Sequence, residues 1–377
     1  MAVVRKALVV GAGIAGTTVA GALQRDGIDV DLIEVEPVPT FRGIGIALLP
    51  PALRCMHQLG LAEACVRQGM PQYTFKTCTA AGEIISERPM RGLLEPSYPP
   101  AVGIARSAFG EILREWALPV GVRARYGTTV TRLANRAASV EVELSDGETR
   151  TYDLVVGADG VHSALRTTMF PDAPPPLYLG QCIWRVLVPA RPEEVDGQML
   201  FLGQTTRAGF NPITHHTMYI YLVHHAENPH RWLTAEASHA AMMENLDEYG
   251  GLMKEMSRLV TPESPTHYGP LYTSFIDGTW HRGRVILIGD AAHTTPPHLA
   301  SGAGIAIEDA IVLARNLRQQ PDVPEAFDAF MSERFERCRM VIENSRTLAR
   351  WDLDPTVPGL KVAELSGRTF EALGTPI

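Results

Sequence analysis

A glycine-rich turn near the N-terminus has the spacing needed to bind a diphosphate. The sequence GAGIAG spans residues 11–16 and follows the short apolar run 7–10. In this arrangement Gly11 permits a tight turn, Gly13 lets a pyrophosphate approach the backbone, and Gly16 lets the following helix pack closely on a sheet. The unpaired N–H groups at the start of that helix attract phosphate oxygens. The turn therefore predicts a nucleotide-binding site.

An acidic residue completes a βαβ unit around this turn. We expect a helix over 17–25 and a second strand over 30–33, which leads into Glu34, 18 positions after Gly16. A carboxylate at this position accepts hydrogen bonds from ribose hydroxyls and repels a 2′-phosphate. The unit therefore favours FAD or NAD over NADP, and does not by itself distinguish the first two.

Two further stretches downstream have the same strand-and-turn character. The apolar run 285–288 leads into GDAAH, which places Asp290 at the carboxyl end of a strand, where α/β folds bind ligands. A helical pattern starts at Gly302, and its N-terminus could stabilise developing negative charge. Between these motifs, residues 153–166 read DLVVGADGVHSALR, which predicts another strand, turn and helix.

In order and spacing, GAGIAG with Glu34, GADGVHSALR, and GDAAH with its two following prolines resemble one family of flavoproteins. They are similar to the group A flavoprotein monooxygenases, the single-component FAD-dependent aromatic hydroxylases related to p-hydroxybenzoate hydroxylase. The resemblance covers nearly the whole chain and favours FAD over NAD. It implies NAD(P)H as a transient co-substrate. It also implies hydroxylation of a small aromatic or N-heteroaromatic substrate with O2 through a flavin C4a-hydroperoxide.

The resemblance also implies roles for individual residues. Asp290 is implied to bind the ribityl chain of FAD, and Asp159 to lie near the pyrophosphate and the nicotinamide route. Arg42 is implied to contact the flavin or its diphosphate, Arg106 to open a helix over the FAD, and the backbone near Val130 to meet the adenine. The complete predicted cofactor-binding set is Gly11, Gly13, Ala15, Gly16, Glu34, Val35, Arg42, Arg106, Val130, Asp159, Asp290, Gly302 and Ala303.

Two positions depart from the pattern of many relatives. Ser301 stands where they carry Gln or Lys before the helix glycine, and Gly304 stands where they carry Asn. Ser301 removes a bulky polar group near the predicted flavin ring. The two changes leave the prediction of FAD binding unchanged, and leave the substrate and the detailed flavin contacts open.

The region 176–270 has a different pattern, with short, partly alternating runs rich in β-branched and aromatic residues. We expect antiparallel strands over 182–188, 198–202 and 217–224. Alternation along the last of these strands predicts one face with Met218, Ile220, Leu222 and His224, and another with Thr217, Tyr219, Tyr221 and Val223. We expect one face of this sheet to cover the flavin and to form a mostly apolar substrate pocket.

Three residues form the predicted catalytic set. Arg185, early in this sheet, could pair with a substrate carboxylate, and the alternative is a surface arginine with a solvated head group. His298 and the adjacent Pro297 are expected near the reactive edge of the flavin, where a histidine could move a proton. His293 belongs to the GDAAH motif and is interpreted as an anchor for its turn.

Two pairs of adjacent histidines occur in the sheet region, at 215–216 and 224–225. Strand alternation directs the members of each pair to opposite faces, which disfavours a shared metal site, so no metal is predicted. One of them could accept a proton from a phenolic substrate. The alternative is that they are polar residues at the edge of a sheet.

These elements predict an α/β fold in which a Rossmann-like FAD-binding domain carries an inserted antiparallel-sheet substrate domain and a C-terminal long helix. Helical apolar spacing over 324–350 predicts that helix. The predicted boundaries are 1–75, 101–175 and 271–350 for the FAD-binding domain, 76–100 and 176–270 for the substrate-binding domain, and 351–377 for a C-terminal tail.

Composition limits the function classes further. The 377 residues carry 42 acidic and 34 basic side chains, a net charge of -8, which argues against a nucleic acid partner. Five scattered cysteines without a CxxC pair disfavour disulfides and zinc and favour a reducing, cytoplasmic location. The apolar N-terminus resembles a secretory signal, but the glycine motif explains it better. No apolar run reaches the ~18 residues of a membrane span, and a monomer or homodimer is expected.

Other reactions on the same fold are alternatives. The sequence has no WxWxIP-like halogenase motif, which disfavours halogenation. A larger polyketide or antibiotic-type substrate and a non-catalytic flavin-binding redox sensor are the two remaining alternatives, because a fold does not establish a function.

Overall fold

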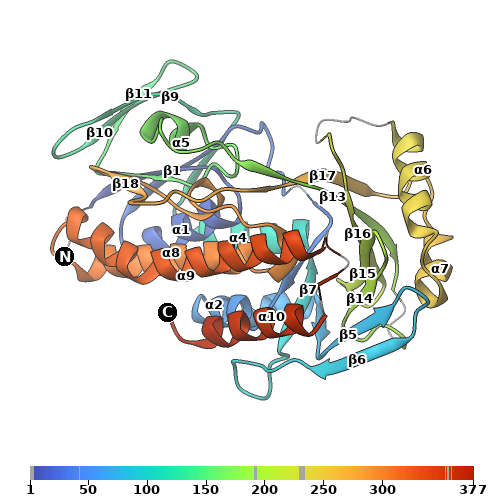
Figure 1. Ribbon diagram of the computed structural model, residues 1–377. Helices are drawn as coiled ribbons and strands as arrows, with labels where there is room; N and C mark the ends of the chain where they lie inside the picture. Colours follow the sequence, from blue (N-terminus) through green and yellow to red (C-terminus); the bar gives the residue numbers. More distant parts are fainter. Residues whose placement is uncertain are drawn as a thin grey trace.

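The computed structural model describes residues 4–41, 43–190, 193–228, 234–352, 354, 356–357 and 359–377. Two large sheets lie side by side, with most of the helices packed against the first (Figure 1). The first sheet has six strands, and all but the edge strand β18 run parallel. In spatial order they are β18 (His281–Arg282), β19 (Val285–Leu287), β12 (Leu154–Gly157), β1 (Lys6–Val10), β2 (Asp29–Glu34) and β8 (Arg123–Tyr126).

The parallel strands are almost continuously apolar because both faces of the sheet are covered. A small antiparallel sheet of β9 (Val130–Asn135), β10 (Val140–Leu144) and β11 (Thr149–Tyr152) contributes to the core on one side. Helices α1 (Ile14–Arg25), α4 (Arg106–Ala117) and α8 (Gly302–Gln319) pack on the other. The predicted long helix is confirmed as α9 (Val323–Asp352), which packs against α8.

A second three-stranded sheet lies between the two large ones. It consists of β3 (Gly45–Leu48), β7 (Ala101–Ala105) and β4 (Met70–Gln72), and β7 contacts a strand of the second large sheet. Helices α2 (Pro50–Gln58) and α3 (Ala62–Gln68) flank it, and α2 also contacts α8. The short helix α5 (Ala164–Met169) follows β12.

The second large sheet has seven strands and confirms the antiparallel character expected for 176–270. Its order is β17 (Thr266–Thr273), β13 (Leu177–Pro189), β16 (Thr217–His225), β15 (Thr206–Pro212), β14 (Gln198–Leu202), β5 (Thr74–Thr79) and β6 (Ile84–Pro89). Every neighbouring pair is antiparallel except β14 with β5. Strands β15 and β17 were not predicted, and β5 with β6 joins this sheet from an earlier part of the chain.

The two faces of the seven-stranded sheet have different partners. Helices α6 (Ala235–Leu246) and α7 (Gly251–Ser257) cover the outer face, where Met218, Ile220 and Leu222 enter a shared apolar core. The alternation predicted for β16 is therefore confirmed. The inner face, on the side of the six-stranded sheet, carries the alternate residues, several of which are polar.

The last part of the chain, assigned from the sequence as a tail, contains helix α10 (Gly359–Gly374). Apolar side chains at Val362, Leu365 and Phe370 pack against the main core. Arg54 donates a hydrogen bond to the main-chain oxygen of Gly374 at 2.6 Å, which caps the last turn of α10. Within the ranges that the structure describes, no helix has both the length and the apolar character needed to cross a bilayer.

Candidate functional site

The three glycines of the first motif have three different environments. Gly11 has φ +101°, and a Cβ there would lie 2.4 Å from the main-chain oxygen of Ala158. A Cβ on Gly16 would lie 1.8 Å from the oxygen of Gly11, so α1 packs directly on the turn. A Cβ on Gly13 would meet no atom within 4 Å. This open space at the N-terminus of α1 is a cradle that fits a diphosphate.

The three sequence motifs meet in space. Ala15 lies against Gly289, where a Cβ would come within 3.0 Å of the Ala15 methyl group. Arg166, the last residue of GADGVHSALR, donates to the oxygen of Ala291 at 3.1 Å and to that of Val161 at 2.5 Å. Arg166 therefore joins the second motif to the third. No role was predicted for Arg166 from the sequence, although it lies within GADGVHSALR.

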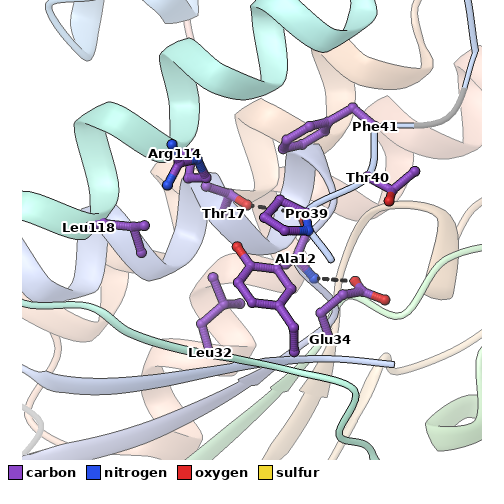
Figure 2. A pocket seen from close by; sticks show the side chains of 10 residues that line it. Ala12, Thr17, Leu32, Glu34, Pro39, Thr40, Phe41, Arg114 and Leu118 are labelled. Atoms are coloured by element: carbon purple, nitrogen blue, oxygen red, sulfur yellow. Dashed lines mark hydrogen bonds between the residues drawn. The ribbon is translucent and has the colours of Figure 1, made fainter. Parts of the chain in front are cut away.

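Glu34 lies in a small pocket beside the first motif (Figure 2). Its carboxylate accepts hydrogen bonds from the N–H of Ala12 at 2.8 Å and the N–H of Glu36 at 3.0 Å, which fixes its orientation. Arg114 lies across the pocket from Glu34 (Figure 2), and Tyr126 also lines the pocket. An acidic group beside aromatic and apolar surface suits an adenosine moiety.

Two other predicted contacts lie away from this pocket wall. Val35 is 61% exposed, and Val130, at the start of β9, packs against the main core. Their roles toward the cofactor stay predictions.

Asp159 organises the turn that packs on Gly11. Its carboxylate accepts hydrogen bonds from the Ser163 hydroxyl at 2.5 Å and from the N–H of Leu165 at 3.1 Å, at the start of α5. Burial raises the pKa of Asp159, and these hydrogen bonds oppose that rise. The structure thus gives this side chain a capping function, and its predicted position near the pyrophosphate stays a prediction.

Asp290 and Arg106 belong to two elements and lie near enough for their charges to influence each other. Asp290 is exposed at the surface, but the protein packed around its carboxyl group desolvates it and raises its pKa, and the nearby charges of His293 and Arg106 oppose the rise. Arg106, the first residue of α4, lies over the preceding loop, 3.1 Å from the position of a Cβ on Gly43. Arg42, predicted in the same region, lies outside the described residues. Gly302 and Ala303 begin α8, as predicted.

A buried network of charged side chains stabilises the GDAAH turn. His293 Nε2 lies 2.6 Å from Asp309 Oδ2, which also accepts a hydrogen bond from the N–H of Gly289 at 2.9 Å. Arg334 donates to Asp309 at 2.8 Å and to Glu308 at 2.7 Å. Although burial alone would lower it, the neighbouring Cys338 and Asp309 hold the pKa of His293 well above its usual value. His293 therefore anchors the turn, in agreement with its interpretation from the sequence.

The spacing of His293, Asp309 and Cys338 is compatible with a metal ion, and all three side chains are buried. Arg334 Nη2 lies 3.4 Å from Cys338 Sγ, and Arg334 also pairs with Asp309. The guanidinium thus already provides the positive charge that a metal would bring. We interpret the cluster as a structural ion pair.

His298 links three segments. It lies with Pro297 in a short 3-10 turn (Pro297–Leu299), and its Nε2 is 3.2 Å from the carboxylate of Asp352 at the end of α9. Asp352 also lies 3.6 Å from Arg207 Nε in β15. The imidazole is almost fully buried in this contact, and the catalytic roles predicted for His298 and Pro297 stay predictions.

Arg185 lies on the inner face of β13, beside Tyr219 and Arg106. Burial lowers the pKa of Arg185, the charge of Arg106 lowers it further, and Tyr219 opposes the change. Among the described residues, Tyr219 and Arg106 influence the pKa of Arg185 and no carboxylate does. Arg185 is half-buried, so its pairing with a substrate carboxylate and the alternative of a solvated head group both stay predictions. Tyr219 shares this position and was not singled out in the sequence.

The two histidine pairs differ: strand alternation applies to His224 and His225 in β16, whereas His215 and His216 precede that strand. His215 and His216 are exposed at the turn between β15 and β16. His224 packs on Trp184, with ring centroids 4.2 Å apart, and its Nε2 lies 3.3 Å from the hydroxyl of Tyr268. Burial lowers the pKa of His224 to about 4.

This pKa predicts acid sensitivity of the seven-stranded sheet. Because the unfolded chain binds a proton near pH 6.5 and the folded chain only near pH 4, stability should fall as the pH drops between these values. We expect His224→Gln to remove roughly 1–2 kcal/mol of that loss, after allowance for partial exposure. Urea denaturation at pH 7.5 and pH 4.5 measures it, with exposed His216→Gln as the control. Equal pH dependence in wild type and His224→Gln would contradict the assignment.

Comparisons with known proteins agree with this geometry. A family model described as an FAD binding domain matches residues 5–345. A putative FAD-dependent monooxygenase, YetM, of Bacillus subtilis is 31% identical, covering 97% of this chain and 98% of that protein. A 3-amino-4-hydroxybenzoate 2-monooxygenase of Streptomyces cremeus is 33% identical, covering 90% and 86%.

A solved structure has the same fold and includes the cofactor. The crystal structure of Klebsiella pneumoniae HpxO complexed with FAD and uric acid matches with a TM-score of 0.86 and 26% identity, covering 98% of this chain and 95% of that one. The cradle at Gly13 and the contacts among the three motifs fit the same cofactor. The chain therefore belongs to the FAD-binding domain family, as a flavoprotein monooxygenase of the single-component aromatic hydroxylase group.

Proposed function

We propose that this protein hydroxylates a small aromatic or N-heteroaromatic acid, using NAD(P)H and O2. The observation that supports it is the half-buried Arg185, whose guanidinium lies beside Arg106 and has no carboxylate partner among the described residues. A partly desolvated cation without a counter-ion is costly, so the position favours an anionic ligand. Arginine binds carboxylates through two parallel hydrogen bonds, which would fix the orientation of a flat ring.

The other residues have distinct roles in this proposal. Gly13 and the N-terminus of α1 would hold the diphosphate of FAD, Glu34 its ribose, and Asp290 its ribityl chain. When bound, FAD would accept two electrons from NAD(P)H and activate O2, by the route predicted from the sequence. The apolar core behind the seven-stranded sheet keeps the inner face rigid, so Arg185 can hold a substrate in one orientation.

The experiment that tests the proposal is a screen of hydroxybenzoates and hydroxypyridines with the FAD-loaded protein. NAD(P)H consumption, O2 uptake and a product heavier by one oxygen atom are expected for at least one compound. NAD(P)H consumption without oxygen in the product, or no consumption with any compound, would refute it. No observation on the described residues favours a larger antibiotic-type substrate.

Replacing Arg185 should separate substrate binding from catalysis. For Arg185→Met we expect KM for the acid substrate to rise roughly 10- to 100-fold, because a charge-assisted bidentate contact is lost. Arg185→Lys should recover only part of it, since an ammonium group lacks the planar fork. Steady-state kinetics measures both, with Arg207→Met, in β15, as the control variant. An unchanged KM in Arg185→Met would show that the arginine binds something other than the substrate.

A further inference from the structure

The turn between the GDAAH motif and helix α8 has a strained main chain. Ala300, which follows the 3-10 turn Pro297–Leu299, has φ +47°, and it is the single non-glycine residue with positive φ in the part of the chain that the structure describes. Its N–H donates a hydrogen bond to the oxygen of Pro297 at 2.8 Å. A left-handed alanine persists only where its surroundings hold it, so this turn needs support from outside its own residues.

Helix α9 provides such support at its C-terminal end, where it packs against the 3-10 turn. His298 Nε2, in the turn, lies 3.2 Å from Asp352 Oδ2, in the last residue of the helix. One turn earlier, the main-chain oxygen of Ala349 accepts a hydrogen bond from Gln181 Nε2 of β13 at 3.2 Å. The end of α9 is thereby fixed on the seven-stranded sheet, and Asp352 has a defined position beside the turn.

The contact with Asp352 leaves the second ring nitrogen of His298 without a partner. The His298 side chain is only 6% exposed, and Nδ1 is buried with no hydrogen-bond partner among the residues that the structure describes. Because Nδ1 is bonded to Cγ, it lies on the side of its own turn, just before the N-terminus of α8. A buried polar atom without a partner is costly, which favours a partner supplied by a bound molecule.

The carboxylate of Asp352 determines which ring nitrogen carries the proton. An ionised carboxylate only accepts hydrogen bonds, so the nitrogen that faces it, Nε2 of His298, must be the protonated one. In a neutral imidazole Nδ1 then carries a lone pair and is an acceptor. Without the carboxylate, either nitrogen could carry the proton, and Nδ1 would be an acceptor for only part of the time.

We infer that Asp352 is a positioning residue that holds His298 with its Nε2–H toward α9, so that Nδ1 accepts a hydrogen bond from a hydroxyl group on the ring of the substrate. The inference rests on the proposed function. As the ring is hydroxylated, the O–H bond of that hydroxyl group breaks, its electron pair stays with the substrate, and its proton moves to Nδ1. The negative charge of Asp352 stabilises the imidazolium that results.

The first test reads the protonation of the ring by nitrogen NMR. The FAD-loaded full-length protein is isotope-labelled in its histidine rings, and the signals that disappear in His298→Gln belong to His298. Chemical shifts distinguish protonated from unprotonated ring nitrogens, and we expect a protonated Nε2 and an unprotonated Nδ1. In Asp352→Ala the two tautomers should be mixed. A proton on Nδ1 in the wild type, or an unchanged tautomer in Asp352→Ala, would overturn the inference.

The second test separates positioning from binding, with a hydroxybenzoate or hydroxypyridine that the wild type hydroxylates. Asp352→Ala should lower kcat roughly 10- to 100-fold, part of the about 100- to 10,000-fold that a positioned base contributes, and should change KM and FAD affinity little. His298→Gln should lower kcat at least as much. In that background Asp352→Ala should have almost no further effect, as a double-mutant cycle measures.

Asp354→Ala is the matched control for Asp352→Ala. Asp354 lies just beyond the end of α9, and its exposed carboxylate accepts hydrogen bonds from the N–H and the hydroxyl of Thr356. This variant removes the same charge from the same part of the chain, and its kcat should equal that of the wild type. Urea denaturation of each variant shows whether a lower kcat comes from unfolding.

Three kinetic results would also overturn the inference. These are an unchanged kcat in Asp352→Ala, a loss of FAD affinity in its place, and additive effects with His298→Gln, which would assign Asp352 to its other neighbour, Arg207. The NMR spectrum of the wild type needs neither turnover nor a variant that folds well. It therefore decides the tautomer even if no compound is hydroxylated, whereas a proton on Nδ1 in an active enzyme would refute the inference and leave the proposed function standing.

Discussion

Gly16→Ala should abolish FAD binding and destabilise the protein by about 3 kcal/mol, the upper range for forcing an extra methyl group into a packed interior. The added Cβ would lie 1.8 Å from the main-chain oxygen of Gly11, an approach that no side-chain rotation relieves. Helix α1 must therefore move away from the turn, and its N-terminal N–H groups move with it. Urea denaturation of the apoprotein and flavin fluorescence on titration with FAD measure the two effects.

Gly13→Ala is the matched comparison, three residues earlier in the same turn. Its Cβ meets no protein atom within 4 Å, and φ of -73° suits alanine. The apoprotein should therefore be as stable as wild type or slightly more so, by up to about 1 kcal/mol, because alanine restricts the unfolded chain. FAD binding should still weaken, since the methyl group enters the predicted diphosphate space. Normal FAD affinity in Gly13→Ala would place the diphosphate elsewhere.

Arg334→Met should cost roughly 3–5 kcal/mol of folding free energy, the usual result of removing one member of a buried ion pair. The guanidinium is fully buried between Glu308 and Asp309, so its loss leaves these carboxylates with only Arg337 and His293 as positive partners. Asp309 also accepts the N–H of Gly289 and contacts His293, so the GDAAH turn should loosen. Chemical denaturation measures the stability, and FAD titration measures the effect on the turn.

Arg339→Met, on the same helix, is the control for Arg334→Met. Arg339 pairs with Glu336 one turn away, and both side chains are largely exposed. Exposed pairs of this kind contribute about 0–1 kcal/mol, so stability should change little. If the two variants were equally stable, the buried network would not support the turn in the way described.

The motifs that the sequence predicted share one physical property. Each joins a short apolar strand to a turn. In the first motif a larger residue at Gly11 or Gly16 would clash with nearby main-chain atoms. Such signals lie within about thirty consecutive residues, so they can be recognised without tertiary information. The long helix α9 was predicted for the same reason, since its apolar spacing is regular over many turns.

The elements that the sequence did not predict lack a local pattern. Strand β15 contains Gly209 and Pro212, which have low strand propensity, and it is stabilised by pairing on both sides. Helix α10 begins directly after proline-rich sequence, which favoured the interpretation as a tail. Its apolar side chains become informative only when the core they pack against is known.

The site was predicted in part for similar reasons. Strand alternation placed Tyr219 opposite Met218, but its partner Asn211 comes from β15 and Gln72 from β4, which are distant in sequence. No spacing connects these amides before the sheets are assembled. The surroundings of Arg185 were not predicted either, because only the pairing of β13 with β16 brings Tyr219 beside it.

The parallel pairing of β14 with β5 has a consequence for recombination between relatives. Residues 74–79, with the neighbouring strand 84–89, complete a sheet whose other strands begin at Leu177, much later in the chain. A chimera that exchanges only the strands from Leu177 onward would pair a β14 from the relative with the native β5, and the side chains of these two strands would no longer match. A gene fragment exchanged in evolution or in a recombination library must therefore encode both residues 74–79 and the strands from Leu177 onward if it is to transfer a substrate preference.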